Sequence, residues 1–183
     1  MTTRDLVLIA LFAAITAVLG LFPALTLPIT GVPVTAQTLG VMLAGSILGA
    51  RRGGLALVVF LVLVAVGLPL LAGGRGGAAV FSGVTAGFLF SWPVAAFVIG
   101  WLTEKAWDRY ALIHAVSINV FGGILIVYAG GIAWMVAVAG SPLDKALYGS
   151  LPFIPVDSLK VIAAATAAVA LKRYQQHPLG RTA

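Results

Sequence analysis

An acidic and a basic residue stand three positions apart in FIPVDSLK, residues 153–160, at the start of an otherwise apolar run. Residues at this spacing share one face of a helix, so Asp157 and Lys160 can pair there. An acid and a base inside an apolar segment are a candidate binding site, because unpaired charges at membrane depth cost several kcal/mol. Pro155 suits the first turn of the helix that would position them. The structural alternative is that Asp157 caps this helix and Lys160 extends toward the membrane interface.

A second cation, Arg75, lies in the glycine-rich stretch GLPLLAGGRGG, residues 67–77. The flanking glycines, among them Gly73 and Gly74, allow positive φ and a close approach of the backbone to another surface. Arg75 and free backbone N–H groups can therefore meet an anionic ligand, whereas the alternative is an exposed, flexible turn. No Lys-Ser or Lys-Thr follows, and no P-loop pattern occurs elsewhere, so this chain is not predicted to bind ATP in that way.

Neutral hydrogen-bonding side chains near these charges are further candidates, namely Gln37, Thr38, Ser82, Thr85 and Tyr128. Each can bind a ligand or bond to a neighbouring helix. We expect Ser82 and Thr85 in the outer half of a helix, next to Gly83 and Gly87, whose spacing of four is typical of close helix packing.

The elements that must position these residues are membrane helices. The chain has 183 residues, of which 61% are hydrophobic and only 9% charged, which is too apolar for a soluble domain of this size. We interpret it as one integral membrane domain, residues 1–183, in the cell membrane. The net charge of +6 is scattered between apolar segments and forms no patch with interleaved aromatics, which argues against nucleic-acid binding.

Six apolar runs predict an all-α bundle of six transmembrane helices. They cover about 6–22, 36–50, 54–71, 80–103, 111–139 and 155–171. The second run is short and the fifth long against the roughly 20 residues that a span needs. Gly122 and Gly123 mark a place where the fifth helix could bend or pack tightly.

Lysine and arginine placement predicts the orientation. An even number of spans puts both termini on one side, and that side then carries most of the basic residues: Arg4, Arg51, Arg52, Lys105, Arg109, Lys172, Arg173 and Arg181. The positive-inside bias therefore predicts cytoplasmic termini. Three sequence-distant stretches, residues 22–38, 67–77 and 151–160, should then converge on the outer side.

Catalysis is not predicted. The chain has no cysteine, and it shows no Ser-His-Asp or paired-carboxylate constellation, so we expect neither an enzyme nor a cofactor. His114 and His177 lack neighbouring ligands at metal spacing, so no metal site is expected.

Ala10 and Ala14, four apart in the first run, give a smooth helical face that another helix or a partner protein can approach closely.

Three stretches together resemble the BioY family, the biotin-specific S components of energy-coupling-factor (ECF) transporters. They are GVPVTAQTLGVMLAGSILGARRG at 31–53, GLPLLAGGRGGAAVFSGVTAG at 67–87 and LPFIPVDSLK at 151–160, in the order and spacing of the family. Val156 and Val84 depart from the pattern, because the family usually has Gly before the aspartate and Pro after Gly83.

The resemblance implies a six-helix bundle that binds biotin from outside and works with a transmembrane coupling subunit and ABC-type ATPases. The chemistry of biotin suits Asp157 and Lys160 at its polar head and Arg75 nearer the mouth of the site, and which cation meets which end stays open. The Pro and Thr content of residues 22–35, next to the site, predicts a lid there. The Ala10/Ala14 face is similar to the small-residue motif by which S components dock on the coupling subunit. Two alternatives remain: an S component for another small vitamin, and a membrane scaffold or assembly protein in which Asp157 and Lys160 are only a structural pair.

Overall fold

The computed structural model describes residues 1–23, 25–26 and 33–176. Within these ranges the chain is almost entirely helical. The α-helices are α1 (Thr3–Leu19), α2 (Gln37–Leu48), α3 (Ala50–Ala65), α4 (Ala86–Lys105), α5 (Leu112–Asn119), α6 (Val127–Ala137), α7 (Leu143–Ser150) and α8 (Ile154–Gln176). Short helical segments η1 (Ala78–Phe81), η2 (Trp107–Arg109), η3 (Val120–Ile126) and η4 (Leu151–Phe153) connect them, and two-residue strands β1 (Leu25–Thr26) and β2 (Pro33–Val34) pair antiparallel.

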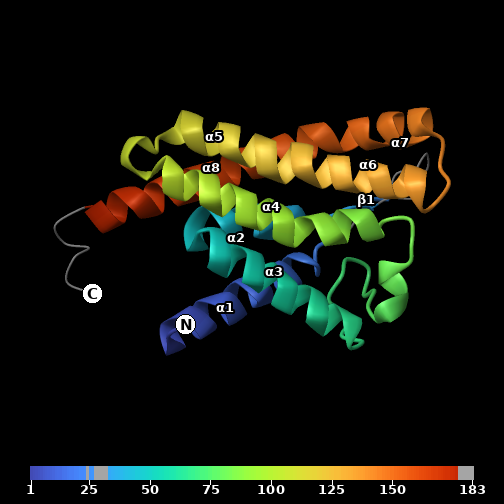
Figure 1. Ribbon diagram of the computed structural model, residues 1–183, viewed down its shortest axis with the longest axis horizontal. Helices are drawn as coiled ribbons and strands as arrows, with labels where there is room; N and C mark the ends of the chain where they lie inside the picture. Colours follow the sequence, from blue (N-terminus) through green and yellow to red (C-terminus); the bar gives the residue numbers. More distant parts are fainter. Residues whose placement is uncertain (24, 27–32, 177–183) are drawn as a thin grey trace.

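Each predicted apolar run overlaps a helix or a series of consecutive helices. Among the described residues, three helical stretches are long and apolar enough to cross a membrane, Ala86–Lys105, Leu112–Ala137 and Leu143–Tyr174. The helix α2 is apolar but shorter. The start of α1 and the end of α8 lie at one end of the bundle with the α4–α5 connection (Figure 1). The strand β1 and the α6–α7 connection lie at the opposite end.

The helix α4 lies in the middle of the bundle, packed against α2, α3 and α6. Small residues permit this close packing. A side chain at Gly45 of α2 would collide with Ile99 of α4, and one at Gly87 of α4 would collide with Trp134 of α6. Gly87 therefore serves close helix packing, whereas Gly83 precedes α4 and a Cβ there would meet only the Val80 carbonyl at 3.6 Å.

The fifth apolar run is interrupted by a π-helical segment, η3, which joins α5 to α6. Two glycines in it lie against neighbouring helices, because a Cβ at Gly122 would meet Ile99 and one at Gly123 would meet Met42. The prediction of an irregular or tightly packed helix at this place is confirmed. Such π-segments shift the register of the residues that follow, and here the first of these are in α6, which carries Tyr128.

The start of the fourth helix was predicted wrongly. The apolar run begins at residue 80, but α4 begins only at Ala86. Ser82 instead ends the 3-10 segment η1, where its hydroxyl donates to the carbonyl of Ala79 at 3.0 Å. The reason is local: an apolar run does not distinguish a short 3-10 turn from the first turn of an α-helix. Ser82 and Thr85 thus precede the helix that was expected to contain them.

Candidate functional site

The charged pair lies near the start of α8. Lys160 Nζ is 2.6 Å from Asp157 Oδ1, and the two residues are only 9% and 4% exposed. Pro155 is the second residue of α8, so its missing N–H removes no helical hydrogen bond. The spacing of three residues puts both side chains on one face, as the sequence predicts. The pair is therefore buried inside the bundle, where each charge requires its partner.

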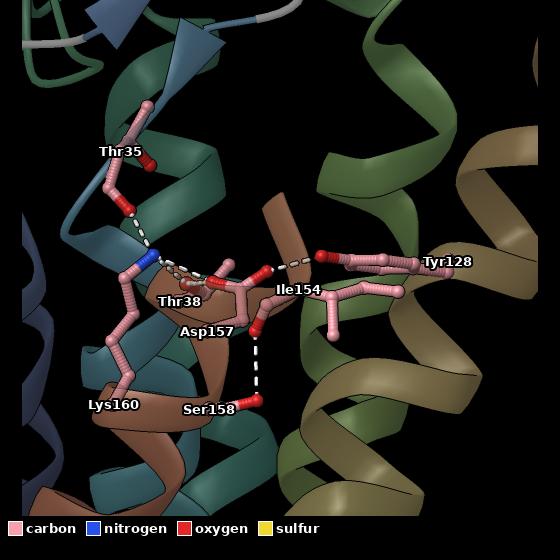
Figure 2. Close-up of polar contacts among 7 residues, drawn as sticks. All are labelled: Thr35, Thr38, Tyr128, Ile154, Asp157, Ser158 and Lys160. Carbon is pink, nitrogen blue, oxygen red and sulfur yellow. Dashed lines mark hydrogen bonds and ion pairs between the residues drawn. The ribbon is translucent and has the colours of Figure 1, made fainter. Parts of the chain in front are cut away.

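Side chains from α2 and α6 complete a network around this pair (Figure 2). Tyr128 donates its hydroxyl to Asp157 Oδ2 at 2.5 Å, and Thr38 donates to Oδ1 at 3.2 Å. Lys160 Nζ also donates to the Thr35 carbonyl at 2.6 Å and to Thr38 Oγ1 at 2.9 Å. The three ammonium protons of Lys160 thus have three acceptors, and both carboxylate oxygens of Asp157 have donors.

Gln37 connects three parts of the chain at the start of α2. Its amide nitrogen donates to the carbonyls of Thr16 and Leu70, at 3.2 and 3.0 Å, and its amide oxygen accepts from the Ala72 N–H at 3.1 Å. The side chain is 1% exposed. Because both ends of the amide bond to backbone, the main effect of Gln37 is to hold the end of α1 and the 67–77 stretch against α2.

The glycine-rich stretch forms a tight turn that ends at Arg75. Leu71 and Arg75 exchange backbone hydrogen bonds of 3.0 and 3.2 Å, and Gly73 and Gly74 between them have φ of +77° and +70°. Side chains other than glycine rarely adopt these angles, so the two glycines shape the turn. Arg75 Nε donates to the Ala72 carbonyl at 3.3 Å, which directs the guanidinium group along the turn.

These elements enclose a cavity of about 590 Å³, including the space at its opening. The lining has a polar or charged group and an apolar group. The first consists of Thr35, Gln37, Thr38, Arg75, Thr85, Tyr128, Asp157 and Lys160, and the second of Val34, Leu71, Phe88, Leu89, Trp92, Val127 and Phe153. Two cations and one anion line it, so its formal charge is +1.

Five of the predicted site residues line this cavity together, namely Gln37, Arg75, Tyr128, Asp157 and Lys160. Gly73, Gly74 and Ser82 are not among the lining residues; the glycines belong to the turn that carries Arg75, and Ser82 bonds to Ala79. Part of the predicted lid, 24 and 27–32, lies outside the described residues, and the remainder contributes β1, β2 and Thr35.

The sequence analysis missed the apolar wall from α4. Phe88, Leu89 and Trp92 line the cavity together with Thr85, at the spacing of one helical face. That periodicity was available in the sequence, but it does not tell which neighbouring element the face meets.

The predicted docking residues lie away from the cavity. Ala10 and Ala14 are both exposed on α1, whereas Ala13 between them is 3% exposed and packs in the core. A smooth strip of α1 is thus open to a partner helix or to lipid.

Comparison with known proteins identifies relatives over almost the whole chain. Residues 1–177 match the BioY family. A biotin transporter BioY of Rhizobium etli is 51% identical over 90% of this chain and 91% of its own, and one of Rhodobacter capsulatus is 45% identical over 96% and 97%. A crystal structure of the S component for biotin from an ECF-type ABC transporter superposes with a TM-score of 0.88 at 30% identity, covering 97% of this chain and 95% of the other. This chain therefore belongs to the BioY family.

Proposed function

We propose that this chain is a biotin-binding S component, an integral membrane protein that takes biotin into the cavity beside Asp157 and Lys160. The observation that carries the proposal is the buried Asp157–Lys160 pair in the wall of a mostly apolar cavity. The family, its biotin-transporting relatives and the S-component fold support the same ligand.

The chemistry of biotin matches the cavity. Its ureido group has two N–H donors and one carbonyl acceptor, its bicyclic ring and valeryl chain are apolar, and its carboxylate is anionic. Asp157 has acceptor capacity beyond its present bonds, since a carboxylate offers about four lone-pair sites. We propose that the ureido head lies against Asp157 and Lys160, while Phe88, Leu89 and Val127 contact the apolar part.

The carboxylate of biotin would then meet Arg75. The positive formal charge of the lining favours an anionic ligand, and Arg75 is the cation of that lining outside the Asp157–Lys160 pair. Gly73 and Gly74 contribute by giving the turn its shape, and Gln37 contributes by fixing the turn to α2. We therefore assign Arg75 a direct contact and the other three residues a supporting role.

In the membrane, we propose one domain of six helical spans with both termini in the cytoplasm. The basic residues near the ends of the chain and in the α4–α5 connection support this orientation, because lysine and arginine favour the cytoplasmic side. The cavity would then open outward. For energised uptake the chain would dock on an ECF coupling subunit through Ala10 and Ala14 and use the ATP hydrolysed by its ATPase partners.

Titration of the purified protein in detergent tests the ligand. We expect biotin to bind with a dissociation constant in the micromolar range or below, corresponding to about −8 kcal/mol or more. Pantothenate and nicotinate, which are also small anionic vitamins, should not displace it. If biotin fails to bind while another vitamin binds, the chain is an S component with a different ligand. If no vitamin binds to the folded protein, the result favours the alternative that the chain is a membrane scaffold or assembly protein.

A further inference from the structure

The helix α4 contributes Trp92 to the cavity wall, and the indole N–H of this residue is used by none of the site chemistry above. Phe88, Leu89 and Trp92 lie on one face of α4 and line the cavity together with Thr85, which directly precedes the helix. Trp92 is the farthest of them from the start of the helix. Its indole ring is 4% exposed and packs against Phe60 of α3, with ring centroids 6.0 Å apart.

The indole N–H of Trp92 has no acceptor among the described residues. Trp134, by contrast, has the partner that a tryptophan N–H usually finds, since its Nε1 donates to the Gly83 carbonyl at 3.0 Å. Buried donors in folded proteins nearly always have a partner, because an unpaired one loses its bonds to water. Two other buried polar atoms without a partner, Thr103 Oγ1 and Tyr110 OH, belong to residues that do not line this cavity.

The ligand needs donors that the charged pair does not supply. All three ammonium protons of Lys160 already have acceptors, on Asp157, Thr38 and Thr35. A ligand oxygen atom other than those of the carboxylate, which Arg75 would meet, must therefore displace one of these bonds or find another donor. An indole can only donate, so a partner of Trp92 must be an acceptor, and biotin has acceptors in its ureido carbonyl and its carboxylate.

We propose that Trp92 is a further ligand-binding residue, whose indole N–H donates a hydrogen bond to an oxygen atom of the bound ligand. The inference rests on the proposed function, since it concerns the same cavity. No acceptor among the described residues meets this donor, and an oxygen atom of a bound ligand would satisfy it. The bond would then favour ligands with an acceptor at this position over ligands that are apolar there.

An isosteric replacement gives the sharpest test. Substituting 3-benzothienylalanine at position 92 keeps the size and shape of the ring system and replaces only the N–H by sulfur. We expect this variant to bind biotin about tenfold more weakly than the wild type, as for the loss of one hydrogen bond. Its melting temperature without ligand should be unchanged or higher, because no bond in the ligand-free protein is lost. Trp92→Phe should show a similar loss of affinity, with some loss of packing.

Two other tryptophans provide matched controls. Trp134→Phe removes the bond to Gly83 and should lower the melting temperature while leaving biotin affinity near the wild-type value. Trp101→Phe, at a position 43% exposed, should change neither. Ligand-induced changes in tryptophan fluorescence should disappear in Trp92→Phe and persist in both controls.

Wild-type affinity in the benzothienyl variant would overturn the proposal, because the N–H would then make no bond to the ligand. A fluorescence response that persists in Trp92→Phe and disappears in a control would also overturn it. These results differ from a failure of the proposed function, in which the wild-type protein itself would not bind biotin.

Discussion

Tyr128 donates its hydroxyl to Oδ2 of Asp157 at 2.5 Å, from α6 to α8. Because Lys160 holds the other carboxylate oxygen, the two contacts fix the position of the carboxylate from opposite sides, as Figure 2 shows. A carboxylate held in this way can receive a ligand N–H without losing either partner, since lone pairs remain. Tyr128 therefore has the geometry to position Asp157 as well as to line the cavity.

We predict that Tyr128→Phe weakens biotin binding by about tenfold, because a hydrogen bond to a charged group contributes about 1.5–3 kcal/mol and only part of it acts on the ligand. Equilibrium titration measures this change. Tyr148→Phe is the matched control. Tyr148 is 71% exposed, so this variant should bind biotin with wild-type affinity. Equal affinities of the two variants would exclude the positioning role of Tyr128.

Removing one charge of the buried pair should destabilise the protein more than removing both. Asp157→Asn or Lys160→Gln alone leaves an uncompensated buried charge, which costs about 3–5 kcal/mol. The double variant Asp157→Asn/Lys160→Gln removes both charges, and its melting temperature should return toward the wild-type value. Thermal unfolding in detergent without biotin measures the series. A double variant less stable than either single one would show that the pair itself stabilises the fold.

Replacing Gln37 by leucine should loosen the glycine-rich turn. The change removes the amide and leaves the carbonyls of Thr16 and Leu70 and the Ala72 N–H without this partner. We expect a loss of at least about 2 kcal/mol of stability, and faster dissociation of biotin as the turn carrying Arg75 moves more freely. Thr166→Val, at an exposed helical position, is the control. An unchanged dissociation rate in Gln37→Leu would show that the turn does not help to retain the ligand.

A bulky residue on the exposed strip of α1 should uncouple binding from transport. We predict that Ala10→Trp or Ala14→Trp abolishes most ATP-driven biotin uptake in vesicles containing the coupling subunit and ATPases, because helices can no longer approach closely. Biotin affinity of the isolated variant should stay unchanged. Ala163 and Ala167 form a similar exposed pair on α8, so Ala163→Trp is the matched control. Impaired uptake in the α8 variant but not in the α1 variants would show that the docking surface lies on α8 and not on α1.

The sequence alone predicted the helical membrane fold and the central charged pair, for physical reasons. Apolar runs and charge placement report the requirements of the bilayer directly. The spacing of Asp157 and Lys160 fixes their common helical face whatever the tertiary structure. The sequence also predicted Arg75, Gln37 and Tyr128 as site residues. Polar residues are few in so apolar a chain, so each of them is a candidate for binding.

What the sequence could not predict depends on tertiary packing. Which amide atoms of Gln37 meet which backbone groups is decided by how α1 and the glycine-rich turn approach α2. The prediction for Ser82 was wrong because a 3-10 turn and a helix start have the same local apolarity. The place of Trp92 in the cavity wall could not be predicted either, since a tryptophan in an apolar run is as consistent with a lipid-facing position as with a buried one.

Whether biotin binds at the buried pair is decided by comparing the biotin affinity of the Asp157→Asn/Lys160→Gln double variant with that of the wild type. Both proteins should be measured by isothermal titration under conditions where their melting temperatures show them folded. We predict tight binding by the wild type and at least about 100-fold weaker binding by the double variant, because ligand contacts to both charged groups are lost. Binding by the folded double variant with wild-type affinity would contradict the account.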